Sequence, residues 1–444
     1  MTAALLSPAF YSTFEDSEAD MSTRSLEDVP EEGSHTPPLP SPGYPNRVPA
    51  PTGSRKAPSM RTLGRTSIDA GSGLRRSSST SSTAVSSPPA VPKENKTPRT
   101  PGTLQKVRSS PRLPHDTDVE AAPSTILYWS KAPVFGIIPT RTMRAHTVTL
   151  VDTTAWLFGG CDDKECSRDI FCFDTETMQW SRPDTIGEVP PPSRAHTATL
   201  VDRKILVYGG GQGSTYYDSI YVLDTATRRW SRPTVTGPTP PPRRAHTGVL
   251  YHGKIYMFGG GNGMTALNDV WTLDVSNMSK LRWEEVQTSG RKPSHRGYHT
   301  ANLIGNIMIV VGGSDGKDCF NDIWCLNLDT LRWTKLAVDT PHRRLSHTAT
   351  QVGSYLFIIG GHDGQKYRPD LLLFNLVSLA FEPRSTLGRA PSARGYHVTI
   401  LADSRLFLFG GFNGNTPFDE VHLLDLAAAA YLPQVTHFDI QLPE

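Results

Sequence analysis

The feature that most constrains the fold of this chain is a pair of adjacent glycines that returns six times, in steps of 50, 50, 53, 48 and 50 residues. Each pair follows about four apolar residues, and the pairs are Gly159-Gly160, Gly209-Gly210, Gly259-Gly260, Gly312-Gly313, Gly360-Gly361 and Gly410-Gly411. A fixed period of this length indicates an array of one repeated structural unit. Because such a unit cannot bury its apolar faces alone, neighbouring units are expected to stack on one another.

Three other landmarks recur in the same order around the glycine pairs. A histidine precedes each pair, an arginine lies two or three residues before that histidine, and an aromatic residue follows the pair after 20 to 23 residues. The histidines are His146, His196, His246, His299, His347 and His397, the arginines are Arg144, Arg194, Arg244, Arg296, Arg344 and Arg394, and the aromatic residues are Trp180, Trp230, Trp283, Trp333, Phe381 and Tyr431. Six ordered occurrences make a chance pattern very improbable.

The second repeat shows how one unit is built. Residues 195–201 alternate polar and apolar, residues 204–208 form an apolar run closed by glycines, residues 219–223 give a third strand signal, and Trp230 begins a fourth. Four strands joined by tight turns form an antiparallel meander. Such a sheet has two apolar faces and open edges, and packing six of them around an axis buries the faces. The sequence therefore predicts an all-β fold, a six-bladed β-propeller.

The Arg, His, Gly-Gly and Trp landmarks at this spacing resemble the kelch repeat family, over about residues 126–444. The resemblance implies a kelch-type propeller that binds proteins or peptides on the face of its variable loops. Phe381 and Tyr431 replace the tryptophan of the other repeats, which predicts weaker outer strands in blades five and six. The layout, an arm followed by a propeller, is similar to fungal kelch proteins of cell-end polarity and of Ras or Rab pathways.

The last blade has two readings. Trp129-Ser130-Lys131 copies Trp180-Ser181-Arg182, so residues 126–131 are predicted to form an outer strand that pairs with blade six and joins the two ends of the ring. Residues 427–430 are alanines, which are poor strand formers and leave room for that exchange. In the alternative reading, residues 431–435 take this position.

Residues 1–123 differ in composition from the repeats, because Ser, Thr, Pro and Arg dominate them. Such a segment cannot bury enough apolar surface to offset its ordering entropy, so we predict a disordered arm ahead of a propeller over residues 124–444. Residues 1–46 carry eight acidic and one basic side chain, whereas residues 47–112 carry thirteen basic and two acidic ones. The basic part favours an acidic partner, and a linker without a fixed partner is the alternative.

The arm also carries seven Ser-Pro or Thr-Pro steps, at Ser7, Thr36, Ser41, Ser87, Thr97, Thr100 and Ser110, and a kinase-like Arg75-Arg76-Ser77-Ser78. Each phosphate adds about −1.5 to −2 charges. Four to seven phosphates would therefore cancel most of the net charge of residues 47–112, which is 13 − 2 = +11. We predict an electrostatic switch on arm binding. Nucleic acid is a weaker candidate partner, because aromatic residues are not interleaved with the basic ones.

Cysteine usage and apolar runs bear on where the chain resides. The five cysteines, Cys161, Cys166, Cys172, Cys319 and Cys325, are odd in number and suggest reduced thiols rather than a disulfide framework. The first residues lack the basic region and apolar run of a signal peptide, and no apolar run approaches the roughly 18 residues that span a bilayer. A soluble, cytoplasmic protein is expected.

The recurring polar residues are expected to serve the scaffold. An ion needs three or four ligands within about 2.3 Å, so the six histidines are predicted to be structural and hydrogen-bonded. The arginines are expected to pair with the aspartate of an adjacent loop. Cys161 and Cys166, with Asp162 and Asp163 nearby, lack a fourth metal ligand at a recognised spacing. We predict no catalytic residue, metal or cofactor; the alternative is an enzyme or specifier protein with a small ligand or metal in the central channel.

Function is expected where the blades differ. In this meander, the loops between strands two and three share one face with the connections between blades, and they span residues 161–168, 211–218, 262–267, 314–320, 362–368 and 412–418. Candidate partner-binding residues at their tips are Tyr216, Tyr217, Met264, Tyr367, Arg368 and Phe412. Exposed aromatic residues beside arginines are typical of interaction hot spots. The sequence thus predicts a non-catalytic scaffold that docks a partner protein on this face.

Overall fold

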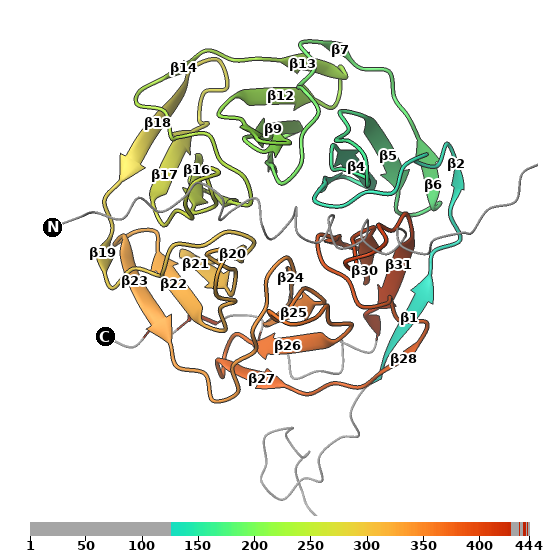
Figure 1. Cartoon of the computed structure of the whole chain (residues 1–444), viewed down its shortest axis with the longest axis vertical. Helices are drawn as coiled ribbons and strands as arrows, with labels where there is room; N and C mark the ends of the chain where they lie inside the picture. The colour runs from blue at the N-terminus through green and yellow to red at the C-terminus, as the bar shows by residue number, and fades with distance from the viewer. Residues whose placement is uncertain (1–125, 428–434, 436–437, 441, 443–444) are drawn as a thin grey trace, which may run out of the picture. The chain divides into compact units, whose positions relative to one another are not determined.

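Six sheets of antiparallel strands surround a central axis in the computed structural model, which describes residues 126–427, 435, 438–440 and 442 (Figure 1). The predicted arm, its phosphorylation sites and Tyr431 lie outside these residues. No α-helix occurs in the described part, and no helix there is long and apolar enough to cross a membrane. The predicted all-β, six-bladed propeller is confirmed.

The first three blades each contain four antiparallel strands and one short outer strand. Blade one has β3 (Thr147–Val151), β4 (Thr154–Phe158), β5 (Ile170–Asp174), β6 (Gln179–Ser181) and β2 (Phe135–Gly136). Blade two has β8 (Thr197–Val201), β9 (Lys204–Tyr208), β12 (Ile220–Asp224), β13 (Arg229–Ser231) and β7 (Ile186–Gly187), and its loop adds β10 (Gly211–Gln212) and β11 (Thr215–Tyr216). Blade three has β15 (Thr247–Tyr251), β16 (Lys254–Phe258), β17 (Val270–Asp274), β18 (Leu281–Val286) and β14 (Val235–Thr236).

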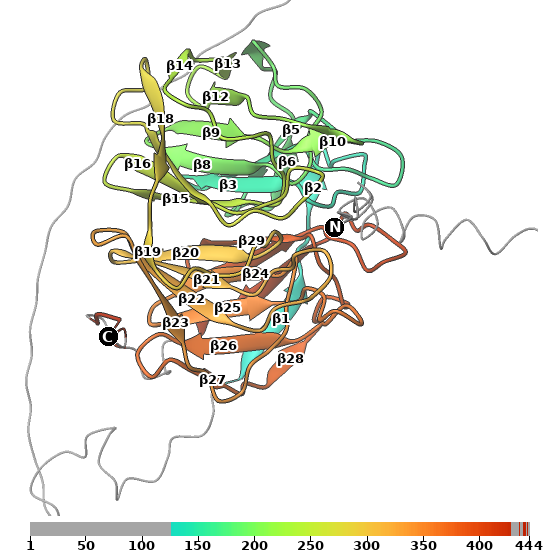
Figure 2. The same ribbon diagram turned by 60° about the vertical axis from the view of Figure 1, so that its left-hand side comes forward.

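The remaining blades follow the same plan with one exception. Blade four has β20 (Thr300–Ile304), β21 (Ile307–Val311), β22 (Ile323–Asn327), β23 (Arg332–Leu336) and β19 (Ser289–Gly290). Blade five has only β24 (Thr348–Val352), β25 (Tyr355–Ile359), β26 (Leu371–Asn375) and β27 (Ala380–Glu382). Blade six has β29 (Val398–Ala402), β30 (Arg405–Phe409), β31 (Val421–Asp425), β1 (Leu127–Lys131) and β28 (Thr386–Gly388). Figure 2 shows the innermost strands running side by side along the middle of the ring.

Strand β1 closes the ring, as predicted from the Trp129-Ser130-Lys131 copy. It pairs antiparallel with β31, from Tyr128 opposite Asp425 to Lys131 opposite His422. The indole of Trp129 is buried in the apolar cluster between blades five and six. Residues from the two ends of the propeller therefore share one sheet.

The short fifth strand was not predicted. In five blades, two or three residues of the preceding connection pair parallel with the outer strand, as Ile186 and Gly187 do with Arg229 and Trp230. Gly187 has a φ of +93°, and a Cβ there would lie 2.1 Å from the Trp230 carbonyl oxygen. Only glycine permits this approach, so the recurring glycine of the connection was the signal for this strand.

Large aromatic side chains fill the spaces between blades, as expected for the outer-strand tryptophans. Trp230 of blade two packs 5.3 Å from Phe158 of blade one, measured between ring centroids. Trp283 of blade three lies 4.9 Å from Tyr208 of blade two in the same way. Burial of one such side chain contributes roughly 1.5–3 kcal/mol, so these contacts hold neighbouring sheets together.

Two closed rings of backbone hydrogen bonds hold the hub. The residue before each hub histidine donates its N–H to the equivalent carbonyl one blade earlier, at 2.8–3.0 Å; the donors are Ala145, Ala195, Ala245, Tyr298, Ser346 and Tyr396. The second glycine of each pair donates to a carbonyl of the next blade, as Gly210 does to Arg243 at 2.9 Å. A Cβ on Gly210 would lie 2.3 Å from the Ser193 hydroxyl oxygen and 2.7 Å from the His196 Cβ. The repeated glycines are therefore structural.

The six hub histidines are buried, and five of them bond to the blade before. Nε2 of each lies 2.9–3.2 Å from the hydroxyl of the threonine that begins the previous innermost strand; the pairs are Thr147 with His196, Thr197 with His246, Thr247 with His299, Thr300 with His347, and Thr348 with His397. At the sixth junction the threonine is replaced by Val398, and His146 has no partner for Nε2 among the described residues. The structural assignment is thus confirmed for five histidines.

Candidate protein-interaction face

The loops between strands two and three lie on one face together with the connections that enter each blade. In every blade, one residue of the connection and one residue of the loop exchange two backbone hydrogen bonds; Arg194 and Gly211 do so at 3.0 and 3.1 Å. We call this surface, formed by the six loops and the six entry residues, the loop face. The repeated bonds fix the backbone of the loop face, whereas the side chains at the loop tips differ.

Five of the six loop tips turn around an Asp or Asn side chain. The acceptor oxygen belongs to Asp162, Asn262, Asp315, Asp363 or Asn413, and in each case it accepts two backbone N–H groups two and three residues further on. Partial burial would raise the pKa of the Asp363 carboxyl, but the N–H groups of Lys366 and Gln365 and the charge of Arg368 hold it below its usual range. The tips are therefore preorganised rather than loose.

The recurring arginines occupy two different positions, which corrects the predicted set of Arg–Asp pairs. Arg296 is completely buried and pairs with Asp322 at 2.7 Å, as expected. In blade three the equivalent residue is Arg243, which pairs with Asp269 at 2.8 Å, rather than the predicted Arg244. Desolvation opposes ionisation of Asp322, but the Arg296 guanidinium holds the pKa of that carboxyl below its usual range.

Arg144, Arg194 and Arg244 stand one residue later, and each contacts a side chain of a loop: Phe412, Cys161 and Tyr216, respectively. The guanidinium of Arg244 donates to the Tyr216 hydroxyl and the Gly213 carbonyl and lies 4.1 Å from the Tyr216 ring centroid. Arg144 lies 4.0 Å from the Phe412 ring centroid. The predicted Arg–Asp pair is therefore formed by Arg296 and Arg344, whereas Arg394 pairs with Glu420 at 3.3 Å.

Two of the predicted tyrosines take equivalent positions on opposite blades. Tyr216 of blade two and Tyr367 of blade five both stand six residues after the glycine pair. Each ring extends over the next blade: a Cβ on Gly263 would lie 2.8 Å from Tyr216, and one on Gly414 would lie 3.3 Å from Tyr367. Both tyrosines are half-buried, so part of each side chain is accessible to solvent.

The other predicted residues differ in how far they reach solvent. Met264 is 71% exposed, the most exposed large apolar side chain in the described part. Tyr217 and Arg368 are half-buried, and Arg368 lies 3.6 Å from the Asp363 carboxylate. Phe412, in contrast, is 5% exposed, because it packs between Tyr367 and Arg144. Phe412 therefore supports the face from below and is not the exposed tip that the sequence suggested.

The central channel offers little room for the small-ligand alternative. Its cavity is about 130 Å³ and is lined by the six histidines and the six residues that precede them. Ligand pockets usually measure about 300–1,000 Å³. Burial lowers the pKa of His146 to about 4, and burial together with the charge of His146 lowers that of His196 to about 3, so both imidazoles are neutral at pH 7.

A metal site is also unsupported by the arrangement of side chains. The described residues contain no group of three or more His, Cys, Asp or Glu side chains placed to hold an ion. Cys161 and Cys166 are buried and are not joined to another cysteine of the described residues by a disulfide. The Sγ atoms of these two cysteines face backbone carbonyls, of Arg144 at 3.8 Å and of Gly211 at 3.9 Å, respectively.

The fold and this face define the class of protein: a β-propeller with a repeated scaffold and an irregular loop face, of the kind used for protein interaction. A family model described as the KLHDC2/KLHL20/DRC7 Kelch-repeats domain matches residues 145–361 and 336–438. These matches cover most of the propeller, so the chain belongs to this kelch-repeat family, which is generally a non-enzymatic interaction fold.

Curated relatives match over shorter segments. The chain is 38% identical over 64 residues to acyl-CoA-binding domain-containing protein 6 of Oryza sativa subsp. japonica, which is 14% of this chain and 10% of that protein. It is 35% identical over 69 residues to human Kelch domain-containing protein 10, covering 15% and 16%, and 36% identical over 78 residues to rat host cell factor 1, covering 14% and 4%. The matched segments thus span a small part of each relative.

Proposed function

We propose that this protein is a non-catalytic adaptor of the cytoplasm that docks a partner protein on the loop face of its propeller. The similarity of its layout to fungal kelch proteins of cell-end polarity and of Ras or Rab pathways supports a role in that kind of signalling. The basic part of the arm adds a second contact with an acidic partner, and phosphorylation of the arm tunes it.

The observation that carries the proposal is the contrast between the backbone and the side chains of the loop face. Every blade holds its loop with the same two backbone bonds, but Met264 stands exposed on one tip and Tyr216 and Tyr367 stand on opposite blades. A rigid surface with exposed apolar and aromatic groups loses little entropy on binding. The contrast favours recognition of one asymmetric partner over catalysis at the axis.

The experiment is affinity capture with the full chain and two single variants. Met264→Asp places a charge on the loop face, and Val377→Asp places one at another exposed apolar residue, in the turn between β26 and β27. The proposal predicts that partners captured by the unaltered protein are lost with Met264→Asp and retained with Val377→Asp. Retention with both variants, at equal thermal stability, would contradict docking on the loop face at Met264.

A further inference from the structure

Blade five breaks the arginine arrangement that blades three, four and six share. In blade four, Arg296 Nε donates to the Ser294 carbonyl at 3.0 Å, and its other nitrogens bond the Gly312 carbonyl and Asp322. Arg243 and Arg394 repeat this pattern, with carbonyl partners for Nε at 3.1 Å in both cases. The guanidinium groups of these three blades are therefore fully engaged.

Arg344 of blade five makes different hydrogen bonds. Its Nη1 donates to the Arg343 carbonyl at 2.7 Å and its Nη2 to Asp370 Oδ2 at 2.6 Å. Its Nε and Asp370 Oδ1 are both buried and have no partner in the described part of the chain, although Arg344 is only 3% exposed. A buried donor and a buried acceptor left unpaired cost free energy unless a ligand satisfies them.

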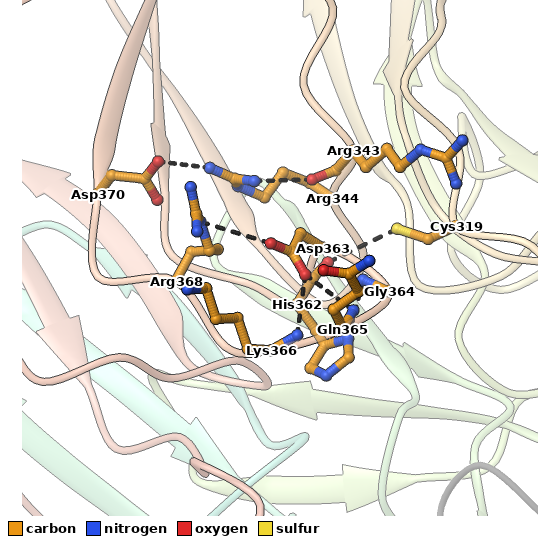
Figure 3. A network of polar contacts seen from close by, with 10 residues as sticks. All are labelled: Cys319, Arg343, Arg344, His362, Asp363, Gly364, Gln365, Lys366, Arg368 and Asp370. Atoms are coloured by element: carbon orange, nitrogen blue, oxygen red, sulfur yellow. Dashed lines mark hydrogen bonds and ion pairs between the residues drawn. The ribbon is translucent and has the colours of Figure 1, made fainter.

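Arg344 lines a cavity of about 640 Å³ between the loops of blades four and five, on the loop face, and Asp370 is its ion-pair partner outside the cavity lining. Pro341, His342 and Arg343 of the connection that enters blade five line the cavity, and this connection forms no short parallel strand. Figure 3 shows Arg344 beside Asp370, and Arg368 beside Asp363, at this site. The cavity thus lies where blade five departs from the arginine arrangement of blades three, four and six.

The wall of the cavity carries four permanent positive charges: Lys317, Arg343, Arg344 and Arg368. Arg343 and Lys317 are exposed, and their side-chain nitrogens have no carboxylate partner among the described residues. Asp363 opposes Arg368, and Asp318 is the second carboxylate of the wall. Burial and the nearby Arg344 charge lower the pKa of His342, so this imidazole adds no charge at pH 7.

We propose that this cavity binds the phosphate of a phosphorylated serine or threonine in the acidic part of the chain's own arm, within residues 1–46. A phosphate dianion offers three oxygens and about two negative charges, which suit guanidinium donors from several directions. Arg343, Arg368 and Lys317 line the cavity and supply donors to the phosphate oxygens, and Arg344 adds a fourth positive charge.

Charge and chain length favour the arm as the occupant. Residues 1–46 carry eight acidic side chains, one arginine and the Ser-Pro or Thr-Pro steps at Ser7, Thr36 and Ser41. Residues 47–125 separate them from the propeller, and 79 residues can extend about 260 Å, which reaches any side of the domain. The basic residues 47–112 would instead be repelled by the cavity.

The test is fluorescence anisotropy with the full, unphosphorylated chain and a labelled peptide of residues 35–46 that is phosphorylated at Thr36 and Ser41. We expect the unphosphorylated peptide to bind about tenfold or more weakly. Arg343→Ala and Arg368→Ala should each weaken phosphopeptide binding about fivefold or more. Arg168→Ala, which removes an exposed arginine of the blade-one loop, one residue past the position that corresponds to Arg368, should leave phosphopeptide binding unchanged.

A second measurement tests whether the phosphate comes from the chain's own arm. A full chain with phosphoserine incorporated at position 41 should bind the labelled peptide about fivefold more weakly than the unphosphorylated chain, because its own arm occupies the cavity. Three results would each overturn the proposal. The phosphorylated and unphosphorylated peptides could bind equally well, the Arg343→Ala chain could bind the phosphopeptide as tightly as the unaltered chain, or the chain with phosphoserine at position 41 could bind it as tightly as the unphosphorylated chain. Met264→Asp should not alter peptide binding, so failure of partner docking and failure of this site are separable.

Discussion

The sixth junction of the hub gives a stability prediction that can be made in both directions. Val398→Thr would place a hydroxyl where five other blades have one, next to Nε2 of His146, which has no partner among the described residues. Thr147→Val makes the reverse change at the junction with His196, where the present distance is 2.9 Å. The two variants exchange the same pair of side chains at equivalent first positions of innermost strands.

The magnitude follows from two opposing terms. A buried polar group left without a partner costs about 1–3 kcal/mol. Exchange of a methyl group for a hydroxyl at a half-buried position loses up to about 0.8 kcal/mol of apolar burial. We therefore expect Val398→Thr to raise the free energy of unfolding by about 1 kcal/mol and Thr147→Val to lower it by about 1–2 kcal/mol. For a domain of this size, 1 kcal/mol corresponds to a shift in Tm of about 2 °C.

Urea unfolding followed by tryptophan fluorescence measures both variants, and an unchanged dependence on urea concentration shows that the unfolded states are comparable. If Val398→Thr were destabilising while Thr147→Val was neutral, the hydroxyl–imidazole bonds would not stabilise the hub. If both variants were neutral, the contribution of these bonds would be negligible.

Three further predictions concern the same scaffold. In urea unfolding, Gly210→Ala should lower the free energy of unfolding by about 3 kcal/mol or more, because its Cβ would collide with neighbouring atoms. Gly213→Ala should lower it by only about 1 kcal/mol, because a Cβ there meets nothing within 4 Å and only the positive φ is unfavourable. Arg296→Met should cost about 3–5 kcal/mol because it strands the Asp322 carboxylate, and the double variant with Asp322→Leu should recover much of this loss in the same assay. Stability measured between pH 7.5 and 4 should fall below pH 6.5, because burial keeps the six hub imidazoles neutral in the folded state while those of the unfolded chain take up protons. A flat profile between pH 6.5 and 5 would contradict that burial.

The repeat made the architecture predictable because its signals are local. Each landmark makes a contact that recurs in successive blades; the landmarks are the glycine pairs, the histidines and the outer tryptophans. Because the same contact is predicted several times over, the repeats together indicate one fold. Even the closing strand could be found, because Trp129-Ser130-Lys131 copies the outer strand of other blades. The competing residues 431–434 lie outside the described part of the chain, so the structure does not describe them beside β1.

The loop face was less predictable because its side chains depend on residues far away in the sequence. Phe412 is covered by Arg144, which enters the ring at the opposite end of the propeller sequence. A one-residue offset between Arg243 and Arg244 decides whether a guanidinium turns into a buried ion pair or toward Tyr216. The cavity beside Arg344 could not be inferred either, because it is lined by the loops of two blades and by the connection between those blades.

Hydrogen exchange of strand β1 tests most directly whether one closed ring supports the loop face. In a closed ring, the amides of residues 127–131 exchange as slowly as those of β30 in the same sheet, because both strands open only with the whole domain. Rapid exchange of residues 127–131 beside a protected β30 would show instead a ring that is open at blade six.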